Sequence, residues 1–294
     1  MNRMNTFKLC FAFIILSALL NATTPIQEGL PLFWWKEGNF VNFGDYLSYK
    51  MVERIAGSPL KFYNKDTPNQ DKKLLGSGSI YYFANEGDVV WGSGINGKRL
   101  DKNDYKFTNL DIRSVRGPLT REFLQSNFGI ITPEIYGDPA LLFPYLFPEF
   151  KRAKNPEHDY IVIVHYLDIP FFTNNKAANI IYATESWDIV IRAILNSKFV
   201  ISSSLHGLVI AEAYGIPARY LRLGEAEPLF KFYDYYQGTG RSSFESAHSI
   251  HEALLMGGEP KIKCDLEKIY QAFPFEFWPS NMAPAIDFTK EVNR

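Results

Sequence analysis

The stretch FVISSSLHGLVIAEAYGIP, residues 199–217, places three serines and a histidine between an apolar run and a helical pattern. It predicts a buried strand, a tight polar turn and a helix whose first turn contains His206. In α/β proteins ligands bind outside the carboxyl ends of strands, where a helix N-terminus presents free N–H donors. Ser202, Ser203 and Ser204 are therefore suited to hold an anion, and His206 to move a proton.

Each of these side chains also has a purely structural interpretation. An imidazole titrates near neutral pH and can act as acid or base, but a histidine at a helix start can also simply bond to the preceding turn. Serine hydroxyls can bind a phosphate, or cap the helix. Asp138, which precedes a proline, is most simply a turn residue, although its carboxylate can accept a proton.

Two other segments contain candidate site residues. Asn42, Gly44 and Asp45 form a turn into a helix predicted over 45–56, so the backbone N–H groups there can meet an anion. Asp45 is a candidate catalytic carboxylate, or only the N-cap of that helix. Arg116 follows a predicted strand and is the leading anion clamp, because its planar fork binds carboxylate or phosphate bidentately. Ser93, in a glycine-flanked turn, is a further candidate for substrate binding.

Composition limits the partners. The chain has 294 residues, 46% hydrophobic and 21% charged, with a formal charge of −1. The sequence contains no long basic block, and this disfavours a nucleic-acid partner. Aromatic residues make up 16% of the chain and include 17 tyrosines; they suit either sugar contacts or aromatic-rich packing. No zinc-type spacing of cysteine and histidine occurs, so we expect no metal site.

The N-terminus has the outline of a secretory signal peptide, predicted over residues 1–22. Arg3 and Lys8 precede an apolar run from Leu9 to Leu20, which is short for a membrane span. We therefore expect a secretory or membrane-associated location, with a cytoplasmic protein as the alternative. One of the two cysteines, Cys10, lies in that run. If the run is cleaved, only Cys264 remains and no internal disulfide is possible.

Short apolar runs alternate with helical patterns, and this predicts an α/β fold with parallel sheets. The charged segment KRAKNPEH, residues 151–158, is the best domain boundary. We therefore expect two Rossmann-like domains, over 30–150 and 158–278, with a cleft between them. The helices are predicted over 45–56, 118–128 and 187–195 and after Ser204. The strands are predicted over 30–35, 73–75, 88–91, 111–116, 160–166, 179–183, 198–202 and 217–221.

Six short motifs occur in one order between residues 39 and 223. They are NFGD (42–45), Gly76-Ser77, WGSGI (91–95), VRGPLTR (115–121), YGDPA (136–140) and SSSLHG (202–207). With these motifs the chain resembles the polysaccharide pyruvyl transferase family, in particular its exopolysaccharide branch.

The resemblance implies a GT-B-like arrangement of the two domains. It also implies transfer of an enolpyruvyl unit from phosphoenolpyruvate to hydroxyls of a saccharide or lipid-linked oligosaccharide, giving a pyruvate ketal. No cofactor beyond the donor is implied. Many members have an arginine where this chain has Ser204, so the cation that meets the donor is left open.

Three other functions are alternatives to pyruvyl transfer. A serine hydrolase is disfavoured because no Gly-x-Ser-x-Gly motif occurs. A nucleotide-sugar glycosyltransferase shares the expected fold. An exported carbohydrate-binding protein without activity fits Ser204 and the leader. Acceptor choice is expected to depend on the loops 61–72 and 224–241, the second of which is rich in Phe and Tyr that either stack on sugars or pack in the core.

Overall fold

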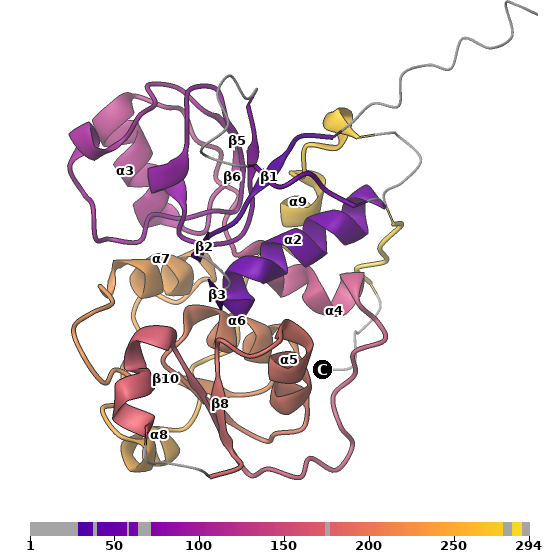
Figure 1. Cartoon of the computed structure of the whole chain (residues 1–294), viewed down its shortest axis with the longest axis vertical. Helices are drawn as coiled ribbons and strands as arrows, with labels where there is room; N and C mark the ends of the chain where they lie inside the picture. The colour runs from indigo at the N-terminus through magenta and orange to yellow at the C-terminus, as the bar shows by residue number, and fades with distance from the viewer. Residues whose placement is uncertain are drawn as a thin grey trace, which may run out of the picture.

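The protein folds around two four-stranded parallel sheets, one in each half of the chain (Figure 1). This computed structural model describes residues 29–37, 40–57, 59–63, 72–173, 177–278 and 284–289. The predicted α/β class with two parallel sheets is confirmed. The GT-B-like arrangement of the halves and the domain boundaries stay predictions.

The first sheet has the order β1-β4-β5-β6. Its strands are β1 (Leu32–Phe33), β4 (Leu74–Leu75), β5 (Val89–Trp91) and β6 (Asp111–Ser114). A short antiparallel pair, β2 (Lys36–Glu37) and β3 (Phe40–Val41), follows β1. The helical segments of this half are α2 (Phe43–Ala56), η1 (Tyr81–Phe83), η2 (Lys102–Asp104), α3 (Pro118–Phe128), η3 (Pro139–Leu142) and α4 (Phe143–Leu146).

The second sheet has the order β10-β9-β7-β8. Its strands are β7 (Ile161–Val164), β8 (Ile180–Tyr182), β9 (Val200–Ser202) and β10 (Ala218–Tyr220). The helical segments are η4 (Tyr166–Phe172), α5 (Trp187–Leu195), α6 (Leu205–Ala213), α7 (Phe230–Gly238), α8 (Ile250–Met256), α9 (Leu266–Gln271) and η5 (Phe275–Phe277). Because the chain goes from β7 to β8 on one side and returns to β9 on the other, the strand order reverses between β7 and β9. Such a reversal is where open α/β sheets bind ligands.

Helix α2 begins two residues earlier than predicted. Asn42, not Asp45, is its N-cap, and the Asn42 side chain accepts a hydrogen bond from the Gly44 amide at 2.9 Å. Gly57 ends the helix with φ 64°, a left-handed conformation that glycine adopts without strain. The prediction of Asp45 as the cap is therefore wrong, and its carboxylate is left available for another role. The predicted bounds of α3 and α5 are confirmed.

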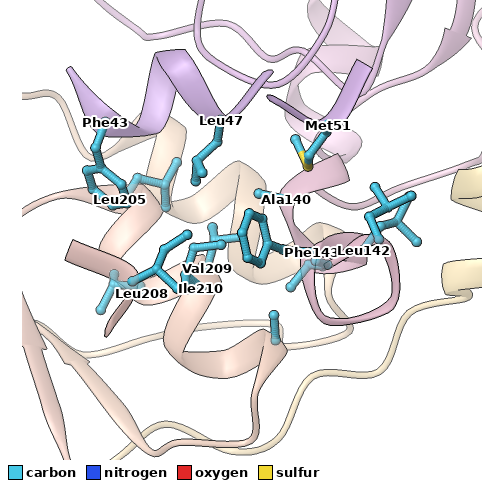
Figure 2. Close-up of a cluster of buried hydrophobic side chains, with 14 of the residues drawn as sticks. Phe43, Leu47, Met51, Ala140, Leu142, Phe143, Leu205, Leu208, Val209 and Ile210 are labelled. Atoms are coloured by element: carbon cyan, nitrogen blue, oxygen red, sulfur yellow. The ribbon is translucent and has the colours of Figure 1, made fainter. Parts of the chain in front are cut away.

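One buried apolar cluster joins the two halves. Leu47 and Met51 of α2, Phe143 of α4 and Leu208 of α6 all belong to this cluster, and all four side chains are fully buried (Figure 2). The cluster extends to strands of both sheets. Helix α9, although near the C-terminus, lies beside α2 in the first half (Figure 1), where the Trp91 indole donates to the Ile269 carbonyl at 2.8 Å. The halves are therefore packed on each other through apolar side chains.

The segment 151–158 contains no helix. His158 forms an isolated parallel bridge with Ser197, which precedes β9, and the Ala153 amide donates to the Leu195 carbonyl at the end of α5 at 2.9 Å. The predicted leader, residues 1–22, and Cys10 lie outside the described residues. Among the residues described, no helix combines the length and the apolar character that a membrane crossing requires. Within the described part of the chain, Cys264 forms no disulfide.

Candidate active site

A cavity of about 300 Å³ opens where the first half meets the β7–β9 reversal of the second sheet. His165 follows β7, and Ser204 follows β9 as the N-cap of α6. The cavity also contains aromatic side chains, namely Trp35, Tyr82, Phe83 and Tyr166, and the ionisable side chains of Asp45, Lys98, Arg99, His165, His206, Glu227 and Lys231. The site thus joins elements of both halves.

His206 is held by two buried side chains of the first half. Its Nε2 lies 2.9 Å from Ser77 Oγ and 3.5 Å from Asp138 Oδ2, and Ser77 Oγ lies 2.6 Å from Asp138 Oδ1. Ser77 donates its hydroxyl proton to the carboxylate, so its oxygen accepts from an N–H at Nε2. The network therefore places a proton on Nε2, and in a neutral ring this leaves the lone pair on Nδ1.

Asp138 is fixed by its place in the chain. It is the N-cap of η3, and its Oδ1 accepts from the Ala140 amide at 2.9 Å. Burial alone would raise the pKa of Asp138, but the neighbouring His206, Ser77 and Ala140 lower it below its usual value. The carboxylate therefore stays charged beside the His206 ring.

Gly44 packs against the His206 ring. A Cβ built at Gly44 would lie 2.1 Å from His206 Nδ1, a distance at which the ring must move. Asp45, the next residue, lines the same cavity, and burial raises the pKa of this carboxyl to about 6, although His206 and Lys231 act to lower it. Asp45 is therefore partly protonated near neutral pH.

The three predicted serines have different positions. Ser204 lines the cavity, and its side chain makes no capping bond to α6. Ser202 Oγ binds the Ser204 backbone, accepting from its amide at 3.0 Å and donating to its carbonyl at 2.7 Å. Ser203 Oγ accepts from the His165 amide at 2.9 Å. Ser202 and Ser203 thus shape the turn, and Ser204 is the one of the three serines that lines the cavity.

Arg116 does not line the cavity. Its side chain is fully buried, its Nε lies 3.1 Å from Asp234 Oδ2, and its two terminal nitrogens donate at 2.6 Å to Ser79 Oγ and the Ile95 carbonyl. In this structure the predicted anion clamp is an internal ion pair that joins β6 to α7, because its guanidinium already has a carboxylate partner.

Ser93 and Asn42 also have partners within the protein. The Ser93 hydroxyl donates to the Gly78 carbonyl at 3.0 Å and is fully buried, so it supports the turn that precedes Ser79. Asn42 lines the cavity while it caps α2. Arg113 and Arg121 pair with the partly exposed carboxylates of Asp111 and Glu134.

Three charged residues of the cavity form an ion cluster that the sequence did not indicate. Lys98 Nζ lies 2.5 Å from Glu227 Oε1, and Lys231 Nζ pairs with Glu227 Oε2. Burial favours the neutral form of Glu227, but Lys231 and His165 outweigh it and bring the pKa of Glu227 to about 2. Burial and Lys231 lower the pKa of His165 to about 3, so that imidazole is neutral.

The aromatic side chains are divided between the core and the cavity. Phe232, Tyr235 and Tyr236 of α7 are fully buried, which agrees with the core interpretation of the 224–241 segment. At the cavity, Trp35 and Tyr166 stack at 5.7 Å. The aromatic surface that a sugar can meet is therefore provided by segments other than the predicted loop. Most of the other predicted loop, 61–72, lies outside the described residues.

Several site residues had only a partial signal in the sequence. Ser77 and Asp138 belonged to recognised motifs. Ser77 was given only a turn role, and Asp138 was interpreted as a turn residue or a proton acceptor, but neither was predicted to contact His206. His165 was placed inside a strand over 160–166, and the strand in fact ends at Val164. Lys98, Glu227 and Lys231 had no signal because only tertiary packing brings them together. Among the residues that the structure describes, no group of three or more potential ligand side chains is placed to hold a metal.

The fold and the site define an α/β protein with a polar cavity between two parallel sheets, built around a buried histidine, serine and aspartate. The family model of the polysaccharide pyruvyl transferases matches residues 21–223, and the chain belongs to that family.

Two curated proteins are similar to it. An uncharacterized protein, L143 of Acanthamoeba polyphaga mimivirus, is 26% identical over 205 residues, covering 66% of this chain and 70% of its own length. The succinoglycan biosynthesis protein ExoV of Rhizobium meliloti is 27% identical over 217 residues, covering 71% of this chain and 65% of its own. A functionally uncharacterized protein from Klebsiella pneumoniae, known from its crystal structure, aligns over 83% of this chain and its own full length, with 15% identity and a TM-score of 0.43.

Proposed function

We propose that this protein transfers a pyruvyl unit from phosphoenolpyruvate to two hydroxyls of a saccharide, releasing phosphate and forming a cyclic ketal. Membership of the family supports a transferase that acts on a polysaccharide. The similarity to a succinoglycan biosynthesis protein supports an exopolysaccharide unit, free or lipid-linked, as the acceptor. The observation that carries the proposal is the His206–Ser77–Asp138 network at the wall of the cavity.

The reaction needs protons to be moved at both hydroxyls and at the methylene carbon. One sugar hydroxyl adds to C2 of the donor and loses its proton while the methylene carbon takes a proton; the second hydroxyl then displaces phosphate at C2 and loses its proton, and the phosphate leaves with its bonding electrons. We assign the base to His206, whose imidazole lines the cavity and is held by Ser77 and Asp138. Asp45, whose pKa is raised to about 6, delivers the proton to the methylene carbon.

The acceptor sugar is assigned to the aromatic part of the cavity. Trp35 and Tyr166 stack at its edge, and Tyr82 lies beneath the Arg99 guanidinium at 3.8 Å. Aromatic rings offer large and rigid apolar faces with polar edges, which suit the alternating faces of a sugar ring. The hydroxyls of the sugar then lie toward His206 and Asp45.

The test is phosphate release from phosphoenolpyruvate with and without β-galactosides or lipid-linked oligosaccharides. We expect release that depends on the acceptor and falls at least about 100-fold in His206→Ala, the usual scale for a lost general base. His248→Ala, an exposed histidine outside the site, should have the activity of the unaltered protein. Equal activity of a folded His206→Ala variant would remove His206 from the mechanism. Sugar binding without any phosphate release would favour the inactive carbohydrate-binding alternative.

A further inference from the structure

The Lys98–Glu227–Lys231 ion cluster occupies the cavity wall on the side of α7. The two carboxylate oxygens of Glu227 are each engaged by one ammonium group. Only 11% of the Glu227 side chain and 8% of the Lys231 side chain are exposed, whereas Lys98 is 39% exposed. The cluster holds two positive charges against one negative charge in a partly desolvated place, where electrostatic attraction is stronger than in water.

Other cations at the cavity are less suited to bind an anion. Arg116 is fully buried and bound to Asp234. The N-cap of α6, Ser204, carries no charge. Among the residues described, the lysines and arginines that line the cavity are Lys98, Arg99 and Lys231. Arg99 is 46% exposed, lies near Asp104 and stacks over Tyr82. Lys231 is therefore the enclosed source of positive charge, and Lys98, which shares Glu227 with it, is the second cation of the cluster.

We propose that Lys98 and Lys231 form the anion-binding site for the donor, and that the charged group of the donor displaces the Glu227 carboxylate from them. This inference rests on the proposed function for the identity of the donor. The Glu227 carboxylate occupies the position that a carboxylate or phosphate oxygen takes when the donor is bound. Even with Glu227 in place, the cluster has a net positive charge, so it attracts an anion.

The two partners of the cluster differ in how they are held. Lys231 belongs to α7, which Asp234 anchors by accepting from Arg116 and from the backbone and hydroxyl of Thr120. Glu227 lies in the irregular segment between β10 and α7. Its carboxylate can therefore move aside by rotating its side chain, while Lys231 stays in place.

The experiment is calorimetric titration of the full chain with inorganic phosphate and with phosphoenolpyruvate, in the absence of acceptor. We expect Lys231→Gln to weaken binding of both anions about tenfold or more, the scale of a lost charge-assisted hydrogen bond, and Lys98→Gln to weaken it less because this lysine is more exposed. Glu227→Gln should strengthen binding about tenfold, because the competing negative charge is gone. Lys198→Gln, whose lysine pairs with Asp159 on the surface, should bind both anions as the unaltered chain does.

Two results would overturn the inference. One is unchanged anion affinity in a folded Lys231→Gln variant. The other is weaker binding in Glu227→Gln, which would make Glu227 a positioning residue for the lysines. Lys231→Arg keeps the charge and should retain most of the affinity, so a loss of folding in Lys231→Gln does not block the test. Anion binding that follows these expectations without turnover would leave the site standing and refute the proposed reaction. If the protein does turn over but its anion affinity is unchanged in the Lys231 and Glu227 variants, the proposed reaction stands and the anion site is refuted.

Discussion

At the scale of single residues, the site depends on the contact between the His206 ring and Gly44, which has no side chain. The His206 ring lies where a Cβ of residue 44 would be, so Gly44 and His206 fit together only as this pair. The same helix start places Asp45 at the cavity. The sequence indicated both residues through the NFGD and SSSLHG motifs, but it could not show that the two motifs touch.

Gly44→Ala is expected to lower kcat about 100-fold, because a shift of about 1 Å in a catalytic group costs that much, and to cost about 1–3 kcal/mol of stability, because the added Cβ overlaps the buried His206 ring. The measurement is steady-state phosphate release. The control is Gly224→Ala, where an added Cβ meets only ordinary contacts with Phe171 at 3.7 and 3.8 Å. A Gly44→Ala enzyme as active as that control would show that the position of His206 does not limit turnover.

Asp45→Asn is expected to stabilise the protein at pH 7.5 but not at pH 4. The pKa of Asp45 is about 6 in the folded chain and about 4 when unfolded. Its protonated form is therefore favoured by folding, and this contribution is present below pH 4 and lost as the pH rises through 6. Because the carboxylate is partly solvated, we expect a gain of about 1–2 kcal/mol at pH 7.5. Urea unfolding at both pH values measures it, and an equal difference at the two would contradict the burial argument.

At the scale of elements, α7 connects the first half to the cavity. Arg116 and Thr120, from the end of β6 and the start of α3, bind Asp234 of α7. Lys231 lies one turn earlier on the same helix. The sequence predicted Arg116 as a ligand-binding residue because an arginine after a strand faces a cleft in many α/β proteins. It could not predict that Asp234, 118 residues later, occupies that guanidinium.

Arg116→Ala is expected to destabilise the protein by about 3–5 kcal/mol, because it leaves the buried Asp234 carboxylate without its cation. Denaturant unfolding measures the loss. In the control, Arg113→Ala removes surface pairs with Asp111 and Glu276 and should cost less than about 1 kcal/mol. A stable Arg116→Ala variant that merely loses donor affinity would restore the original interpretation of Arg116 as an anion clamp.

At the scale of the whole molecule, the sequence predicted the elements well and their assembly poorly. Apolar periodicity placed the strands and three helices because local spacing records which face is buried. The core between α2, α4 and α6 joins segments more than 150 residues apart in the chain, and no local pattern records such a contact. The charged cavity residues escaped prediction for the same reason.

Leu208→Ala is expected to destabilise both halves together by about 2–5 kcal/mol, since its side chain lies in the shared core. Hydrogen exchange followed by mass spectrometry should show faster exchange in the strands of both sheets. Leu255→Ala, at a side chain that is 75% exposed, should leave exchange unchanged. Faster exchange confined to the second sheet would show that the halves unfold independently.

The apolar core between the halves has a consequence for the kinetics of substrate exchange. Domains joined by a large apolar surface have little freedom to hinge, so ligands must enter and leave by movement of loops. The segments that contain Lys98 and Glu227 come from opposite halves and meet across the cavity. If product release limits turnover, as it does in many enzymes, the turnover rate depends on how fast the Lys98–Glu227 ion pair breaks and reforms. The turnover rate should then rise with ionic strength, because salt weakens the ion pair.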